Sequence, residues 1–351
     1  PFEPTDDLEA LMNDAPPAHP ALSSGWTQFS PLRSWLADEG ISAADVIGAT
    51  VFTVDDPTAR MAGVRPAVHA EAEPTLQEIT TCDGSNASPC DAGGSRVCGT
   101  HQNFVEIHAK LNMGNFLQGA PPYAQWGGGA AFTDGKPRLQ RPESVCVAFS
   151  IPRGSPPAGG WPVAIFSHDQ GGHFRTAIEE GLSERFTQAG WVVLSYDGVL
   201  HGTRYGLDTV PEAADVVARL NDPYRPELMR DQSLQGAADL FSITRLLEGL
   251  SLTSPNGAIA MSSEKIAFVG HGRGAEYGVP FLAYEPRVTA AVLAGAGGDV
   301  LDQLRLGTSP VNLAAMVVLG LVDPDLNGMH PGLQIMQHWL DARDPMNFGL
   351  L

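Results

Sequence analysis

The sequence predicts an α/β fold built on a doubly wound, mostly parallel sheet. From Trp161 onward, short apolar segments of strand length alternate with longer segments of helix length, which is the pattern of repeated strand and helix units. The apolar segments are uninterrupted, as in PVAIF at residues 162–166, and this is typical of parallel strands that are covered on both faces. Polar turns follow these segments, at the sheet edge where α/β proteins bind their ligands.

The expected elements of this part of the chain follow one another in a regular order. We predict strands at residues 162–166, 191–196, 265–269 and 288–293. We predict helices at residues 176–189, 225–250, 274–284, 311–321 and 331–342. Gly190 closes the first of these helices, because glycine is the usual residue after a helix end.

Residues 1–150 show a different pattern, and we expect them to form a smaller β-rich accessory region that precedes a main domain over residues 151–351. Strand-like runs occur at residues 49–54, 104–113 and 145–151. In the second run, apolar residues alternate with polar ones, which is the period of a half-buried strand. A short amphipathic segment at residues 31–39 is a candidate helix.

Composition excludes several classes of function. The 351 residues are 43% hydrophobic and 17% charged, so the chain is long enough to bury a large core. The formal net charge of -19 repels a phosphate backbone, which excludes DNA and RNA as partners. No apolar run of about 18 residues is present, so we expect no membrane-spanning segment. Because the chain begins at Pro1, we expect its N-terminus to have been processed, trimmed or truncated.

Three of the four cysteines lie in one polar loop. Cys82, Cys90 and Cys98 are eight residues apart in the stretch CDGSNASPCDAGGSRVC, and Cys146 lies in a strand-like run. The spacing lacks the CxxC pairs of a structural zinc site. We therefore expect a disulfide between two of the three, which favours a secreted, periplasmic or cell-envelope location. Three free thiols on a cytosolic loop are the alternative.

Histidine-bearing turns follow three of the expected strands. These turns contain Ser167-His168-Asp169-Gln170, Asp197-Gly198-Val199-Leu200-His201, and Gly270-His271-Gly272-Arg273-Gly274. Since the carboxyl ends of parallel strands meet at one edge, we expect His168, His201 and His271 to lie on one rim, with Asp197 beside them. Each histidine alone is also explained as a hydrogen-bonded turn residue, but three at one edge indicate a site.

The order of these motifs resembles the α/β-hydrolase fold family. The resemblance rests on the His/Gly-rich turn after the first strand, the Asp and His-Gly after the second, a long helix with Asp231-Gln232, and the GHGRG turn at residues 270–274. It covers roughly residues 160–345 and is closest to bacterial esterase/lipase-like members with an N-terminal accessory domain. It implies a serine ester hydrolase that acts on small-molecule or lipid esters through an acyl-enzyme, without a cofactor or metal.

The chain departs from the family pattern at the nucleophile. The resemblance places a serine between the glycines of a strained G-x-S-x-G turn, but Gly272 stands at that position. It assigns the backbone N–H of Arg273, and one near Asp169 and Gln170, to the oxyanion hole. Asp169 stands where the family usually has glycine, and a carboxylate that points inward would oppose a developing oxyanion.

The acid and base of the family are also not evident. They follow the nucleophile at the ends of two further strands, yet we expect no such strands after residue 293, so the hydrolase-like domain looks incomplete at its C-terminal side. The polar residues available there are Asp299, Asp302, Asp323, His330 and His338. None of them follows a predicted strand in the required order.

Three functional interpretations remain open at this point. The first is a serine ester hydrolase that is inactive because residue 272 is Gly, and the second is a pseudo-hydrolase that binds a ligand or a partner at the cell envelope. The third is a zinc or iron site, whose candidate ligands are His168, Asp169, His173, Asp197, His201 and His271. Residues 203–226 are a candidate lid over the pocket, with a solvated loop as the alternative.

Overall fold

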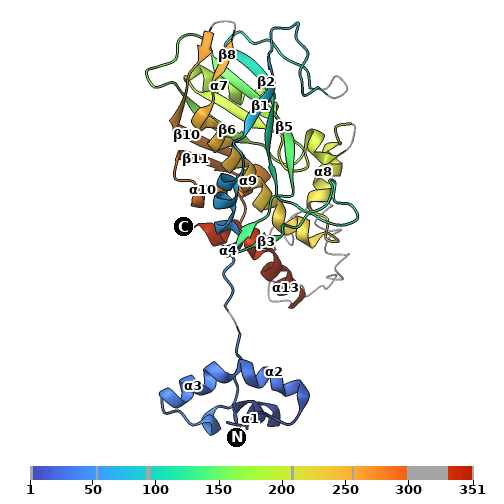
Figure 1. Ribbon diagram of the computed structural model, residues 1–351, viewed down its shortest axis with the longest axis vertical. Coiled ribbons are helices and arrows are strands. Elements are labelled where there is room, and N and C mark those ends of the chain that lie inside the picture. Colours follow the sequence, from blue (N-terminus) through green and yellow to red (C-terminus); the bar gives the residue numbers. More distant parts are fainter. Residues whose placement is uncertain are drawn as a thin grey trace. The chain divides into compact units, whose positions relative to one another are not determined.

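The computed structural model describes residues 3–52, 54–91, 96–206, 209–254, 257–298 and 331–349. Contacts divide the chain into two compact units, Pro1–Asp56 and Pro57–Leu351. Each unit has a hydrophobic core of its own. The two units are shown in Figure 1, coloured along the sequence.

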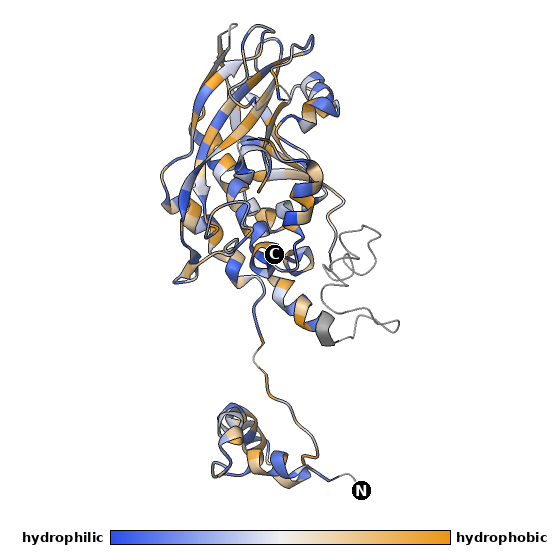
Figure 2. Ribbon diagram, turned by 90° about the vertical axis from the view of Figure 1, so that its right-hand side faces the viewer, coloured by the Kyte–Doolittle hydropathy of each residue, from blue (hydrophilic) through white to orange (hydrophobic). Residues whose placement is uncertain are grey.

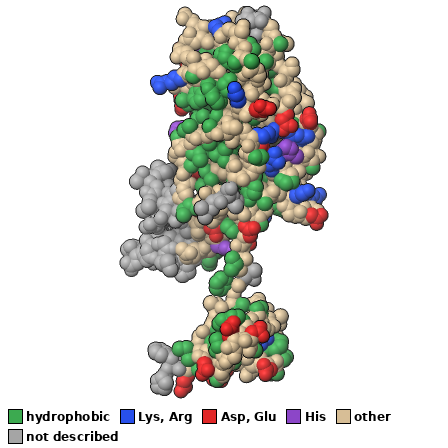
Figure 3. All heavy atoms as spheres, turned by 90° about the vertical axis from the view of Figure 1, so that its left-hand side faces the viewer, with side chains coloured by type: hydrophobic (Ala, Val, Ile, Leu, Met, Phe, Trp, Pro, Cys, Tyr) green, Lys and Arg blue, Asp and Glu red, His purple; other side chains and the backbone are tan. Residues whose placement is uncertain are grey.

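The N-terminal unit is helical. It contains α1 (Asp6–Met12), α2 (Pro20–Gln28), α3 (Ser30–Asp38) and a short 3₁₀ turn, η1 (Ala43–Asp45). Thr5 caps α1 by accepting a hydrogen bond from the Leu8 backbone, and acidic side chains lie over the surface of this unit (Figure 3). The amphipathic segment at residues 31–39 lies almost entirely in α3.

The strand predicted at residues 49–54 is wrong. Residues 49–52 and 54 form neither helix nor strand. Phe52 is 75% exposed and Val54 is 81% exposed, so the apolar side chains of this run meet no sheet. Without a partner strand to accept its backbone hydrogen bonds, a run of β-branched and aromatic residues does not become a strand.

The larger unit contains a seven-stranded sheet with the order β1-β2-β5-β7-β6-β10-β11. The strands are β1 (Thr75–Thr81), β2 (Phe104–Asn115), β5 (Arg141–Pro152), β6 (Trp161–Ser167), β7 (Val192–Tyr196), β10 (Met261–His271) and β11 (Val288–Ala294). Strands β6, β7, β10 and β11 are mutually parallel, and β5 pairs antiparallel with both β2 and β7. This arrangement confirms the predicted fold class, a mostly parallel sheet of the α/β-hydrolase type.

Helices cover both faces of the sheet. On one face lie α5 (Val64–Ala70), α9 (Pro226–Gly249) and α10 (Arg273–Tyr284), and on the other lie α6 (Thr176–Glu179) and α7 (Leu182–Gln188). Successive residues of β7 point to opposite faces: Val192 and Leu194 pack in the α9 core, and Val193 packs toward α7. Figure 2 shows the hydrophobic residues along these strands.

The remaining elements are shorter. They are α4 (Ala59–Ala62), α8 (Ala213–Leu220), α13 (Pro331–Leu340), the 3₁₀ turns η2 (Gly202–Tyr205), η3 (Asp341–Arg343) and η4 (Pro345–Phe348), and two ribbons, β3 (Phe132–Thr133) with β4 (Lys136–Pro137) and β8 (Leu252–Ser254) with β9 (Gly257–Ile259). Among the described residues, no helix is both long enough and apolar enough to cross a bilayer.

The strands of residues 75–152 belong to the main sheet rather than to a separate β-rich region. Strand β5 pairs with β7 from Val147 opposite Tyr196 to Ser150 opposite Val193. The boundary expected at residue 150 therefore falls inside β5, and the contacts divide the chain at Asp56 instead. These strands look separate in the sequence because long loops, and not helices, connect them.

The helices predicted after residue 160 are confirmed with one change wherever the structure describes the chain. The helix expected at residues 176–189 is divided into α6 and α7 at Gly181, whose φ of 75° is left-handed. Helices α9, α10 and α13 lie where they are predicted. The helix expected at residues 311–321 lies outside the described residues.

Two glycines of α9 give a matched test of core packing. A Cβ at Gly236 would lie 2.4 Å from Cγ of Tyr277, whereas a Cβ at Gly249 has no neighbour within 4 Å. We expect Gly236→Ala to lower the free energy of unfolding by about 1–3 kcal/mol through overpacking. Gly249→Ala serves as the control and should be neutral or slightly stabilising, because alanine favours helix. Urea unfolding of both variants measures the difference, and equal stabilities would contradict this packing.

Candidate functional site

The turn between β10 and α10 has the backbone of a nucleophile elbow without the nucleophile. Gly272 has φ 51° and ψ -118°, which is a conformation that side chains strain to adopt. Cβ atoms at Gly270 and Gly274 would lie 2.6 Å from Cα of Ala275 and 2.1 Å from the Ser167 carbonyl oxygen. Both flanking glycines are therefore required by close backbone contacts, as the G-x-S-x-G resemblance implies.

Asp169 fills the place that a side chain at residue 272 would take. A Cβ on Gly272 would lie 2.1 Å from Oδ1 and 2.6 Å from Oδ2 of Asp169. The same Oδ1 accepts a hydrogen bond from the Arg273 backbone N–H at 2.8 Å. That N–H is the donor that the resemblance assigns to the oxyanion hole. The carboxylate of Asp169 therefore fills the space beside Gly272 and engages the Arg273 N–H, which are the two positions that the resemblance assigns to the nucleophile and to an oxyanion donor.

The side chain of Gln170 is held by the segment that was expected to form a lid. Asn221, which follows α8, donates from Nδ2 to Oε1 of Gln170 at 2.6 Å. The Asn221 Oδ1 in turn accepts from Nη2 of buried Arg273 at 2.8 Å. Nη1 of Arg273 donates to Glu276 at 2.5 Å. These bonds fix residue 221 against both turns, while the lid function of residues 203–226 and the backbone role of Gln170 stay predictions.

His168 and His201 lie together, as predicted, but each has both ring nitrogens in use. Nε2 of His168 accepts from the Gly198 N–H at 3.0 Å, and Nε2 of His201 accepts from the Gly171 N–H at 3.0 Å. Their Nδ1 atoms therefore carry the protons and donate to the carbonyls of Asp169 and Val199. The two rings meet edge to face at 4.6 Å.

Burial keeps these two histidines neutral. Desolvation lowers the pKa of His168, and burial together with the neighbouring His168 lowers the pKa of His201 to about 3. A general base needs a free nitrogen that faces the substrate. Neither ring has one, so these histidines act as cross-links between the turns after β6 and β7.

Asp197 is also structural. It is fully buried and pairs with Arg96 from the cysteine loop, and its Oδ1 accepts from the Phe174 backbone at 3.0 Å. Burial by itself would raise the pKa of Asp197, but the Arg96 guanidinium holds it below its ordinary value. The pair attaches the cysteine loop to the carboxyl end of the sheet.

The alternative interpretation, a metal site at this rim, is not supported by the geometry. His168 and His201 spend their Nε2 lone pairs on backbone N–H groups, and Nε2 of His173 lies 3.1 Å from Glu179. His271 is exposed. Within the part of the chain that the structure describes, the one group of three side chains with metal-ligand spacing is Cys82, Cys98 and His108.

Most of the residues considered as a catalytic acid or base lie outside the described residues. Asp299, Asp302, Asp323 and His330 lie outside the described residues. His338 is described on α13, where its side chain is 71% exposed and lies 3.9 Å from Asp341. No catalytic role follows for it.

Two residues that hold the site together were not foreseen. Arg96 and Asn221 are both buried and contact the turns after β6, β7 and β10. A buried carboxylate requires a cation, so Asp197 at a strand end was a signal for a partner such as Arg96. The sequence holds no comparable signal for Asn221.

Comparison with known proteins shows likeness of fold alone. No family model and no curated protein matches the sequence. The acetyl xylan esterase from Paenibacillus sp. R4 is 13% identical with a TM-score of 0.48, over 86% of this chain and 77% of that chain. Acetyl xylan esterase 1 from Thermoanaerobacterium sp. JW/SL YS485 is 12% identical with a TM-score of 0.49, over 84% and 74%. At such low identity, activity and substrate are not transferred.

The buried neutral histidines make stability depend on pH. Below the ordinary histidine pKa of about 6.5, the unfolded chain binds a proton at His201 that the folded chain excludes. The free energy of unfolding therefore falls as the pH falls. Between pH 6.5 and pH 5, we expect the free energy of unfolding of His201→Gln to fall by about 2 kcal/mol less than that of the parent chain. Urea unfolding at the two pH values measures the difference.

His271→Gln is the matched control, because His271 follows a neighbouring strand but is exposed. It should keep the pH dependence of the parent chain. If His201→Gln and the parent have parallel profiles, the assignment of His201 as a buried neutral side chain is wrong.

Proposed function

We propose that this chain is a pseudo-hydrolase, an α/β-hydrolase-type scaffold that works by binding a ligand or partner and carries out no acyl-enzyme chemistry at its elbow. One observation carries the proposal. Oδ1 of Asp169 accepts from the Arg273 N–H at 2.8 Å and lies 2.1 Å from where a Cβ of residue 272 would be. The site is closed by the chain itself.

Acyl transfer needs a nucleophile and a free oxyanion donor, and this elbow supplies neither. Gly272 has no hydroxyl to attack an ester. The negative charge of Asp169 stands where the negative charge of a tetrahedral intermediate would develop. In a serine hydrolase, loss of the nucleophile alone costs about 10⁶ in kcat.

The resemblance to ester hydrolases supports a ligand class, and the disulfides support a location. In an ester hydrolase this site would bind small-molecule or lipid esters. We propose that this chain still binds such a molecule, or a protein, without hydrolysing it. Disulfides join Cys82 to Cys98 and Cys90 to Cys146. The first pair is one of the pairings that the sequence predicts. Disulfides persist in oxidising compartments, so we place the protein outside the cytosol, secreted or in the cell envelope.

A second candidate function uses Asp169 itself as the nucleophile. Its carboxylate is half-buried at the elbow, and carboxylates form covalent intermediates in other enzymes. One observation argues against this candidate: the Arg273 N–H already donates to the Asp169 carboxylate and is not free to donate to an oxyanion.

Hydrolysis of p-nitrophenyl acetate separates the two candidates. We expect the parent chain and Asp169→Asn to release p-nitrophenol at the same slow rate, because neither has an activated nucleophile. The thermally unfolded chain gives the background. Turnover by the parent chain that Asp169→Asn abolishes would contradict the pseudo-hydrolase and support the carboxylate nucleophile.

The steric relation between Asp169 and Gly272 gives a second test. Gly272→Ser should destabilise the fold by roughly 1–3 kcal/mol from backbone strain alone, with the clash in addition. Asp169→Gly should lower the free energy of unfolding by about 1–3 kcal/mol, because it leaves the Arg273 N–H without its acceptor. The double variant removes the clash. We therefore expect its loss of unfolding free energy to be about 1–3 kcal/mol smaller than the sum of the losses in the two single variants.

Urea unfolding of the four chains in this cycle measures the coupling. Gly272→Ser combined with Gly249→Ala is the control and should be additive, because a Cβ at Gly249 meets nothing. Additivity in the Asp169 cycle as well would show that the carboxylate does not occupy the elbow.

A further inference from the structure

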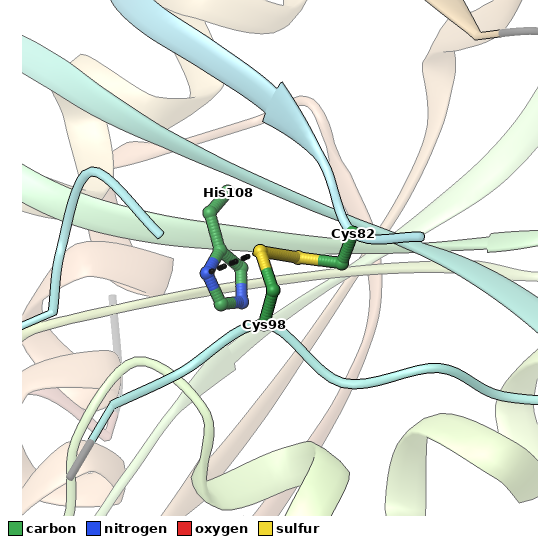
Figure 4. Close-up of side chains that lie close together, drawn as sticks. All are labelled: Cys82, Cys98 and His108. Atoms are coloured by element: carbon green, nitrogen blue, oxygen red, sulfur yellow. Dashed lines mark hydrogen bonds between the residues drawn. A yellow bond between two sulfur atoms is a disulfide. The ribbon is translucent and has the colours of Figure 1, made fainter. Parts of the chain in front are cut away.

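A second cluster of reactive side chains lies away from the elbow, where the cysteine loop meets β1 and β2. Cys82 follows β1, His108 is in β2, and Cys98 is at the end of the loop (Figure 4). One ligand atom from each of the three residues lies within 4.8 Å of the others. In this structure the two sulfurs form a disulfide.

The imidazole of His108 is oriented as a metal ligand. Nε2 lies 2.7 Å from Oε1 of buried Glu106. A carboxylate oxygen accepts hydrogen bonds, so Nε2 is the ring nitrogen that donates, and Nδ1 is the one left to bind a metal. A carboxylate behind a histidine is the usual outer partner of zinc ligands.

The second ring nitrogen of His108, Nδ1, lies near the sulfur of Cys98. Nδ1 of His108 lies 3.8 Å from Sγ of Cys98. A sulfur and a nitrogen that bind the same tetrahedral zinc ion at the usual bond lengths are about 3.5 Å apart. The hydroxyl of Ser88 lies 2.8 Å from Nδ1 and also accepts from the Cys90 N–H. A metal would replace this serine at Nδ1.

Glu106 is itself rigidly held, which a positioning group for a metal ligand requires. Besides His108, it accepts from the Arg175 side chain at 2.8 Å, from His101 at 2.8 Å and from the Gly99 N–H at 3.0 Å. Gly99 directly follows Cys98, so Glu106 positions the loop as well as the imidazole. No metal is needed to pre-form the His108 side of the cluster.

We propose that Cys82, Cys98 and His108 form a redox-dependent zinc site. A dithiol reductant supplies two electrons and two protons to the Cys82–Cys98 bond, which gives two thiols, and is itself oxidised to a disulfide. A phosphine does the same with water, which supplies the two protons and the oxygen of the phosphine oxide. Zn²⁺ then displaces both thiol protons and is bound by two thiolates and Nδ1 of His108, with water in the fourth position. In the reverse direction a disulfide oxidant accepts two electrons from the thiolates, takes two protons from the solvent to become thiols, restores the Cys82–Cys98 bond and releases Zn²⁺.

The two disulfides differ in a way that makes the exchange selective. Cys98 is partly exposed, whereas Cys90 and Cys146 are 2% and 1% exposed. Reductants therefore reach the Cys82–Cys98 bond first. The Cys90–Cys146 bond packs beside Phe174 and Ala148 and keeps the loop attached to β5 while the other pair is open.

Cobalt binding by the full chain tests the site, because tetrahedral thiolate-bound Co²⁺ absorbs in the near ultraviolet and visible. We expect the phosphine-reduced chain to bind one Co²⁺, displaceable by Zn²⁺, and the oxidised chain to bind none. Glu106→Gln should weaken binding by about 10–100-fold, and His108→Ala by at least as much.

Paired cysteine variants give the matched control, since each removes one disulfide. Cys82→Ala/Cys98→Ala should abolish the absorption bands, and Cys90→Ala/Cys146→Ala should retain them. Equal binding by the two double variants, binding unaffected by His108→Ala, or no Co²⁺ on the reduced parent chain would overturn the proposal.

Thermal unfolding covers the case in which reduction loosens the loop. Zinc that binds only the folded chain raises the unfolding temperature, so we expect a rise for the reduced parent and none for the oxidised chain. No rise in the reduced parent would contradict the site whether or not the loop had loosened.

Discussion

The arrangement around the elbow depends on one close approach, between the bare Cα of Gly272 and the carboxylate of Asp169. Any side chain at residue 272 would displace this carboxylate from the Arg273 N–H. The two residues are therefore mutually dependent: the glycine makes room, and the carboxylate satisfies the Arg273 backbone donor. The turn combines a strained backbone at Gly272 with an internal hydrogen bond to Asp169.

The other polar residues of this rim extend the same principle. His168, His201 and Asp197 lie at strand ends, where substrate would be expected, yet each is buried and directed at backbone or at Arg96. Buried polar groups are costly unless they are paired, and here the pairing joins neighbouring turns. These cross-links join the turns after β6 and β7 to each other and to the cysteine loop.

Much of the main sheet was predictable because buried parallel strands give uninterrupted apolar runs, as at residues 162–166, and because segments of helix length separate these runs. The N-terminal unit was not predictable from the sequence. The apolar run at residues 49–54 resembles a strand, and only a structure can show that no described strand pairs with it. At the site, the sequence indicated the departures Gly272 and Asp169 and placed them near each other. It did not reveal that one fills the space left by the other, because this depends on side-chain direction at the atomic scale.

The hydrogen bond between the Asp169 carboxylate and the Arg273 N–H is the central claim, and the amide proton of Arg273 reports on it directly. Charge-assisted hydrogen bonds are short and strong, so NMR of the labelled chain should place this amide proton well downfield and should show it moving as the carboxylate is protonated. In Asp169→Ala the proton should shift upfield and lose that pH dependence. An Arg273 amide that is identical in both chains would show that the elbow is open and that the account of a closed site is wrong.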